Sequence, residues 1–150
     1  MTNPKARRWR YKFKKAWSWP ESVEKFISLF LVSPSLHIFC GESDLGDIRV
    51  DLHTDADVKA DAFHLPFRNE SFQTIVADPP WHLAYHLRPK LIREIVRVLK
   101  TGGKLIWNAP WWPNSRHLKV EEVWYAKPNT YRICPIILIA VKLPNIQRGG

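Results

Sequence analysis

The residues best suited to chemistry in this chain stand in one short run, Asp78-Pro79-Pro80-Trp81. The run follows Thr74-Ile75-Val76, and β-branched residues of this kind are typical of a buried strand. Two consecutive prolines can neither continue the ladder of a strand nor enter the interior of a helix, so the chain must leave the sheet here. The sequence therefore predicts a stiff loop that presents a carboxylate, two carbonyl groups and an indole at the carboxyl end of a strand. That edge is where open α/β sheets bind ligands.

Two stretches near this loop carry the spacing of amphipathic helices. The first runs from Pro20 to a turn at Ser33-Pro34-Ser35, and the second runs from Pro89 to Thr101-Gly102-Gly103, where the glycine pair is expected to end it. Each stretch has one apolar face, so each helix is expected to cover a sheet.

Short apolar runs predict the strands of that sheet at 36–40, 48–52, 74–77 and 104–107. Two further runs, 120–126 and 131–143, flank a turn at 127–130 and predict an antiparallel hairpin. The order of helices and strands predicts a three-layer α/β sandwich with a mostly parallel sheet that closes with this hairpin.

Asp-Pro-Pro followed by an aromatic residue resembles the catalytic loop of S-adenosylmethionine-dependent amino-methyltransferases, in particular those that act on the N6 amine of adenine. The form with Trp81 is most similar to the branch that includes the RNA adenine methyltransferases. By order and spacing the resemblance covers residues 19–143. It implies a Rossmann-like class I methyltransferase fold in a single domain at 19–150, with S-adenosyl-L-methionine as the cofactor and no metal.

The same resemblance implies where the cofactor binds. Phe39-Cys40-Gly41 is similar to the opening of the cofactor loop, whose backbone meets the methionine end of the cofactor. Asp51, at the end of a strand, would accept hydrogen bonds from the ribose hydroxyls. Asp61 and the N–H of Ala62 would recognise the adenine; the alternative, which the following Leu65-Pro66-Phe67 and Ser71-Phe72 make weaker, is that Asp61 closes a turn. Only the seven residues 41–47 separate two expected parallel strands, so the helix usual at this place is expected to be missing, which leaves the cofactor pose open.

The chemistry implied for the loop requires few groups. If Asp78 and a proline carbonyl (Pro79 or Pro80) accept the two N–H bonds of an exocyclic amine, its lone pair turns toward the methyl donor, and Asp78 thereby adjoins the cofactor. Trp81 would stack on the target ring. Trp111 and Trp112 follow a later strand at the same edge; they suit either a wall for a flipped base or the packing of their own loop.

Charge points to a polyanionic partner. The chain has 150 residues, enough for one domain, and a formal charge of +9. Residues 1–18 form a basic arm without acids in which aromatic residues alternate with cations, and Arg8, Arg10 and Lys12 are expected to contact phosphates. A solvated tail is the alternative. A homodimer or a partner subunit would supply further recognition.

The rest of the composition indicates the cellular compartment of the protein and whether it spans a membrane or binds a metal. Cys40 and Cys134 are the two cysteines and have neither metal-ligand spacing nor a disulfide framework, which favours a reduced, cytoplasmic protein. The apolar run 26–32 is too short to cross a bilayer. Seven acids lie between Glu42 and Asp61, but their spacing fits neither a calcium loop nor a zinc site, so no metal is expected.

The function that this sequence predicts is methylation of an exocyclic amine of a nucleic-acid base, with adenine N6 first. Guanine N2, a protein amide and a small molecule remain alternative acceptors. A catalytically silent nucleic-acid-binding module on a methyltransferase fold is a hypothesis of another class. Cofactor binding separates it from the enzymes, because such a module needs none.

Overall fold

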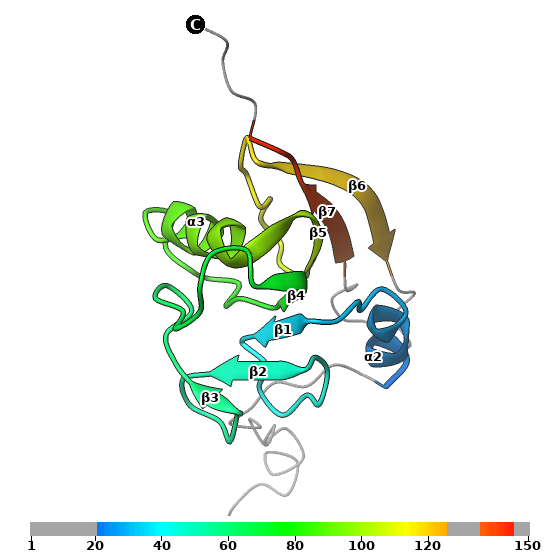
Figure 1. The fold of residues 1–150 in the computed structure, drawn as a ribbon. Helices are drawn as coiled ribbons and strands as arrows, with labels where there is room; N and C mark the ends of the chain where they lie inside the picture. Colours follow the sequence, from blue (N-terminus) through cyan, green and yellow to red (C-terminus); the bar gives the residue numbers. More distant parts are fainter. Residues whose placement is uncertain (1–20, 126–135, 146–150) are drawn as a thin grey trace, which may run out of the picture.

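The computed structural model describes residues 21–125 and 136–145. Within them, seven strands form one sheet and a helix packs on each face (Figure 1). The helices are α2 (Glu21–Ser28) and α3 (Arg88–Val98). The strands are β1 (Ser35–Ile38), β2 (Ile48–Asp51), β3 (Val58–Lys59), β4 (Phe72–Ala77), β5 (Leu99–Trp107), β6 (Leu118–Tyr125) and β7 (Ile136–Lys142). The expected arm at 1–18, the turn at 127–130 and Cys134 lie outside the described residues.

The sheet has the strand order β3-β2-β1-β4-β5-β7-β6. Strands β3, β2, β1, β4 and β5 are parallel, whereas β7 runs antiparallel between β5 and β6. The expected three-layer α/β fold with a terminal antiparallel hairpin is therefore confirmed. Because the five parallel strands all point the same way, the loops that follow them share one edge of the sheet.

The connection between β1 and β2 contains no helix, as its length predicted. Its last residue is tied to the start of β1: the Ser35 N–H donates to Asp47 Oδ2 at 2.8 Å, and the Asp47 N–H donates to the Ser35 carbonyl at 3.1 Å. Gly46 lies in this turn with a φ of +94°. The turn replaces the usual crossover helix with a direct return to the amino end of β2.

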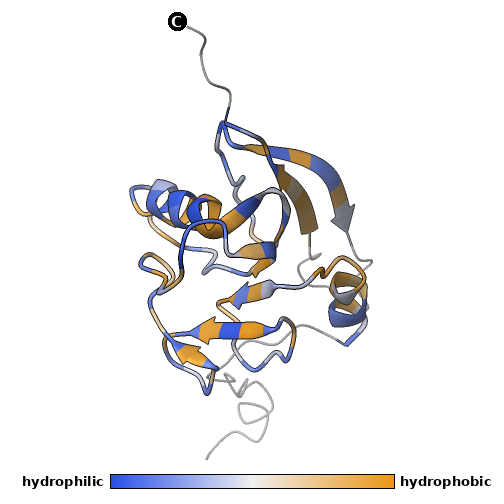
Figure 2. Cartoon of the chain, viewed as in Figure 1, coloured by the Kyte–Doolittle hydropathy of each residue, from blue (hydrophilic) through white to orange (hydrophobic). Residues whose placement is uncertain are grey.

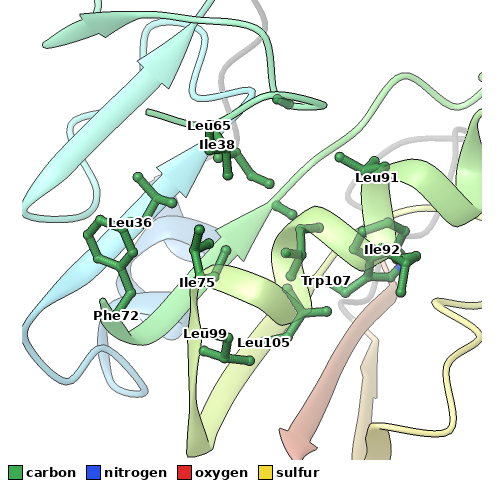
Figure 3. Packing of buried hydrophobic residues seen from close by; sticks show 14 of the residues in the cluster. Leu36, Ile38, Leu65, Phe72, Ile75, Leu91, Ile92, Leu99, Leu105 and Trp107 are labelled. Atoms are coloured by element: carbon green, nitrogen blue, oxygen red, sulfur yellow. The ribbon is translucent and has the colours of Figure 1, made fainter. Parts of the chain in front are cut away.

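Two apolar layers hold the sheet. On the α3 face, Leu91, Ile92 and Ile95 pack on residues of the strands, and the fully buried indole of Trp107 lies beside Leu91 and Ile92 (Figure 3). On the other face, a smaller layer links α2 to β4, β5 and β7. In Figure 2, β7 is hydrophobic along its length, which agrees with its position inside the sheet.

Helix α3 ends earlier than the glycine pair suggested. It stops at Val98, and Leu99 is already extended and paired with Phe72. Lys142 Nζ donates to the carbonyls of Val96 and Leu99 at 2.8 and 2.7 Å, so a side chain from β7 satisfies the groups that a glycine cap would otherwise serve.

Gly102 and Gly103 therefore lie within β5, which was expected to begin only at Lys104. The ladder to β4 passes from Phe72–Leu99 to Thr74–Lys104, so 100–103 bulge out of the strand. Glu70 Oε1 holds this bulge by accepting the N–H and hydroxyl of Thr101 at 3.0 and 2.8 Å.

Helix α2 is also shorter than expected. It ends at Ser28, whose hydroxyl donates to the Lys25 carbonyl at 2.6 Å, and the following turn is closed by i→i−3 bonds. The Thr74 hydroxyl then accepts the Val32 N–H and donates to the Val32 carbonyl, which fixes the chain in an extended course. Neither helix among the described residues has the length and apolarity that a membrane crossing needs.

Candidate active site

Five loops converge at the carboxyl edge of the sheet, one after each parallel strand. Nearly all the expected site residues that the structure describes follow these strands, and Asp51 is the last residue of β2. Apart from Asp78, the expected cofactor residues lie at the end of β2 and in the loops after β1 and β3. The loops after β4 and β5 carry Asp78, Trp81, Trp111 and Trp112.

Asp51 links two of these loops. Its Oδ2 accepts the N–H of Gly41 at 3.0 Å, and its Oδ1 accepts the N–H of His53 at 2.8 Å. Each carboxylate oxygen has two lone pairs, so each retains one for another donor. The side chain is partly buried and faces the loop after β1.

The loop after β1 turns sharply at its first residues. Phe39 and Gly41 both have positive φ angles, 57° and 55°, and Cys40 between them is buried. Burial, followed by the charge of Asp51, raises the pKa of the Cys40 thiol, so the side chain is a neutral thiol at neutral pH rather than a nucleophile. The role open to this loop is the one expected from its sequence, close approach of backbone groups to a ligand.

Asp61 closes a turn after β3, and its other lone pairs remain available. Asp61 Oδ1 accepts the N–H of Phe63 at 2.9 Å, and His64 Nδ1 lies 3.6 Å from Asp61 Oδ2. Ala62 is buried, and no described atom accepts its N–H. Both roles considered for Asp61 are thus compatible with this turn.

The loop after β4 places Asp78 beside the first residue after β5. Asn108 Nδ2 donates to Asp78 Oδ1 at 3.4 Å, and the Asn108 N–H donates to the carbonyl of Ala77 at 3.0 Å. The Pro80 carbonyl accepts the N–H of Leu83 at 3.1 Å, whereas no described donor reaches the Pro79 carbonyl. Asn108 was not among the residues expected from the sequence. The feature that would have indicated it is its position directly after β5, since Asp78 directly follows β4 and the last residues of the two strands, Ala77 and Trp107, are paired.

The aromatic residues of this edge differ in exposure. Trp81 and Trp111 are partly buried, whereas Trp112 is 58% exposed. The ring of Trp111 packs edge-on against Trp107 at 4.7 Å between centroids, and its carbonyl accepts Trp107 Nε1–H at 3.0 Å. The buried ring of Trp107 therefore holds Trp111 against the body of the protein.

Acids elsewhere in 42–61 serve the fold. Asp44 and Asp57 form ion pairs with Arg49 at 3.3 and 3.2 Å, and Asp47 caps the start of β1. Within 21–125 and 136–145, no group of three or more histidine, cysteine or acidic side chains is arranged to hold a metal.

A polar cleft of about 330 Å³ lies at the opposite, amino edge of the sheet. Its cations Arg97 and Lys142 are already bound. Arg97 contacts Glu94 at 2.6 Å and the Phe67 carbonyl at 2.7 Å, and Lys142 caps α3. These contacts make the cleft part of the scaffold, remote from the converging loops.

Comparisons with known proteins agree with the fold. The strand order with an antiparallel β7 is that of the class I methyltransferases, and residues 44–107 match the family described as "Methyltransferase domain". The fold of this chain is therefore that of the class I methyltransferases, and residues 44–107 are similar to a family whose methyl donor is S-adenosyl-L-methionine.

Among individual proteins, the chain is 44% identical over 48 residues to a phthiotriol/phenolphthiotriol dimycocerosates methyltransferase of Mycobacterium leprae. That match covers 32% of this chain and only 17% of the relative. A solved S-adenosylmethionine-dependent methyltransferase of Methanosarcina mazei is similar over 80% of this chain and 98% of its own, with a TM-score of 0.58 and 15% identity. TrmN of Thermus thermophilus is similar over 73% of this chain and 43% of its own, with a TM-score of 0.57 and 20% identity. These two similarities concern the fold.

Proposed function

We propose that this protein transfers a methyl group from S-adenosyl-L-methionine to an acceptor held beside Asp78. The observation that carries the proposal is the geometry of Asp51, which joins the loops after β1 and β2 and retains an acceptor lone pair on each oxygen. A neighbouring pair of ribose hydroxyls fits those two acceptors. The Ala62 N–H and Asp61 would hold the adenine, as their turn after β3 permits.

When bound, the cofactor supplies a methyl group on a positively charged sulfur. The chain's contribution is position and charge. Asp78 is partly buried at the end of β4, and its amide neighbour Asn108 fixes one of its oxygens. A carboxylate in this place favours the cationic donor and accepts a hydrogen bond from the acceptor group. Alignment of two bound reactants alone lowers a barrier by several kcal/mol, on the order of 7 or more in the best cases.

A small molecule is the first candidate for the acceptor. The protein of Mycobacterium leprae named above is called a methyltransferase of phthiotriol and phenolphthiotriol dimycocerosates, and its 44% identity over 48 residues supports an acceptor of low molecular weight. The exposed ring of Trp112 and the partly buried ring of Trp81 offer flat apolar surfaces for it at the carboxyl edge.

An exocyclic amine of a nucleic-acid base, adenine N6 first, is the second candidate. The specific observation in its favour is that Asp78 and the Pro79 carbonyl, which no donor of the described residues reaches, supply two acceptors in one loop. Two acceptors suit an amine with two N–H bonds. Guanine N2 or a protein amide would use the same pair, and the charge of +9 supports a polyanion.

Cofactor binding is the experiment that tests the function, by titration calorimetry of the full chain with S-adenosyl-L-methionine. We expect Asp51→Ala to weaken binding by about tenfold or more, because hydrogen bonds to a charged group contribute roughly 1.5–3 kcal/mol. Asp55→Ala, an exposed acid four positions later, is the matched control and should bind as the wild type does.

Asp51→Asn keeps one acceptor oxygen, so its affinity for the cofactor should lie between those of Asp51→Ala and Asp55→Ala. A thermal melt of each variant reports whether the protein remains folded. A folded wild type that binds no cofactor contradicts the proposal and supports the silent module. If the cofactor binds, transfer of a labelled methyl group to lipid extract, DNA and RNA then separates the two acceptor candidates.

A further inference from the structure

Arg88 stands out at the carboxyl edge because its guanidinium is held in place without a counter-charge. Its Nε–H donates to the Leu83 carbonyl at 2.9 Å. Its Cζ lies 4.1 Å from the ring centre of Tyr85 and 4.8 Å from that of Trp111. One ring comes from the loop after β4 and the other from the loop after β5, so the guanidinium lies between the two loops that carry Asp78 and Asn108.

No acidic side chain among residues 21–125 and 136–145 forms an ion pair with Arg88. All fourteen Asp and Glu residues lie in 21–125, and none of the described ion pairs includes Arg88. The segments outside the described residues contain no acidic side chain. The arginines that serve the scaffold are different: Arg49 and Arg97 are each bound to carboxylates.

The donors of Arg88 are therefore available to a ligand. Apart from Nε, its N–H groups reach no acceptor in the described residues. A guanidinium presents these groups as a planar fork that matches two oxygens of a carboxylate or a phosphate. Because the rings and the Leu83 carbonyl already restrict its side chain, little rotamer freedom is lost when an anion binds. Tyr85, 81% exposed, leaves the site open to solvent.

We propose that Arg88 is a specificity residue that binds an oxyanion, a phosphate or a carboxylate, on the methyl acceptor. The inference rests on the proposed function, in which the acceptor lies beside Asp78. It narrows the acceptor to molecules that carry such a group a short distance from the methylated atom. The oxyanion belongs either to a small acidic molecule or to the backbone of a polynucleotide.

The test compares probes that differ by the anion alone, with binding measured by calorimetry on the full chain. Adenosine 5′-monophosphate against adenosine reports a phosphate, and benzoate against benzamide reports a carboxylate. We expect the wild type to prefer the anionic member of at least one pair by about tenfold, and Arg88→Gln to lose that preference. Arg93→Gln, an exposed arginine on the same helix, is the matched control and should retain it.

A short single-stranded oligonucleotide distinguishes the two sources. If it binds more tightly than the monophosphate and this gain disappears in Arg88→Gln, the anion is a polynucleotide phosphate. If it binds no better than the monophosphate, the anion belongs to a small molecule. An unchanged preference in Arg88→Gln, or a wild type without preference for any of these anions, overturns the inference.

The two proposals fail separately. Cofactor affinity is measured on the same variants, and Arg88→Gln should bind S-adenosyl-L-methionine as the wild type does. A wild type that binds no cofactor contradicts the methyltransferase function. The preference for anions is measured without cofactor, so it tests the binding of an oxyanion by Arg88 separately.

Discussion

At the scale of single residues, His37 shows how a polar side chain is fixed within the sheet. It is 1% exposed on β1, and its Nδ1 lies 3.2 Å from the Leu45 carbonyl. Burial lowers the pKa of His37 from 6.5 to about 4, with Arg49 adding to the decrease while the Leu45 carbonyl and Asp51 oppose it. His37 is thus neutral in the folded protein at neutral pH.

This pKa predicts a pH dependence of stability. Between pH 6.5 and about 4 the unfolded chain takes up a proton at His37 that the folded chain does not, so the free energy of unfolding falls as pH decreases through this window. The expected loss is about 3 kcal/mol, because one pKa unit corresponds to about 1.4 kcal/mol. Urea unfolding of the wild type and of His37→Asn over this range measures it.

The His37→Asn variant should show a shallower pH dependence in that window, whereas replacement of the exposed His86 by Asn should leave the wild-type slope. If the free energy of unfolding changed with pH equally in the wild type and in both variants, His37 would not be the group responsible for the pH dependence.

At the scale of elements, Gly103 is the residue on which the bulge of β5 depends. A Cβ at this position would lie 2.8 Å from the carbonyl oxygens of Gln73 and Lys100 and 2.9 Å from Leu99 Cδ1. Two of these atoms belong to the backbone and cannot move aside cheaply. Gly103→Ala should therefore reduce the free energy of unfolding by about 2–3 kcal/mol.

The neighbouring Gly102 provides the comparison. Nothing lies within 4 Å of a Cβ added there, but its φ is +78°, so Gly102→Ala should cost only about 1 kcal/mol, from backbone strain. Urea midpoints of the two variants measure the difference. A Gly103→Ala protein as stable as Gly102→Ala would mean that the bulge rearranges without loss.

The elements also show where sequence reasoning succeeded. Apolar periodicity located α3 and the strands other than the two-residue β3, and the length of 41–47 predicted the missing helix, because these features depend on local spacing. The ends of both helices were placed too late. Their limits are set by tertiary contacts, Lys142 on α3 and Thr74 on the chain after α2, which no local pattern encodes. Asn108 and Arg88 were not predicted as site residues because their positions, too, depend on tertiary contacts. The predicted order of strands did place the loops after β4 and β5 at the same edge of the sheet.

At the scale of the whole molecule, the charge of +9 predicts affinity for polyanions whatever the acceptor. We expect binding of a labelled oligonucleotide to weaken by more than about tenfold between roughly 50 and 200 mM salt, because released counterions drive such binding. Fluorescence anisotropy measures it.

The basic residues near the N-terminus offer the variant for this experiment. A full-length protein with Arg8, Arg10 and Lys12 replaced by glutamine should show a smaller dependence on salt, with cofactor affinity unchanged. If the salt dependence stays the same, those three cations do not contact the polymer, and other basic residues of the chain supply the contacts.

The stabilising contacts described above lie at the amino edge of the sheet, whereas the candidate site lies at its carboxyl edge. This separation affects how such a protein can evolve. The cap that Lys142 forms on α3, the Arg97–Glu94 pair and the bulge held by Glu70 lie at the amino edge, away from the loops around Asp51 and Asp78. Substitutions in those loops act on sites that share few partners with the stabilising network, so their effects should combine nearly additively with it. Lineages with this scaffold can therefore exchange one acceptor for another through loop changes alone, while the strand order persists after most of the sequence has diverged.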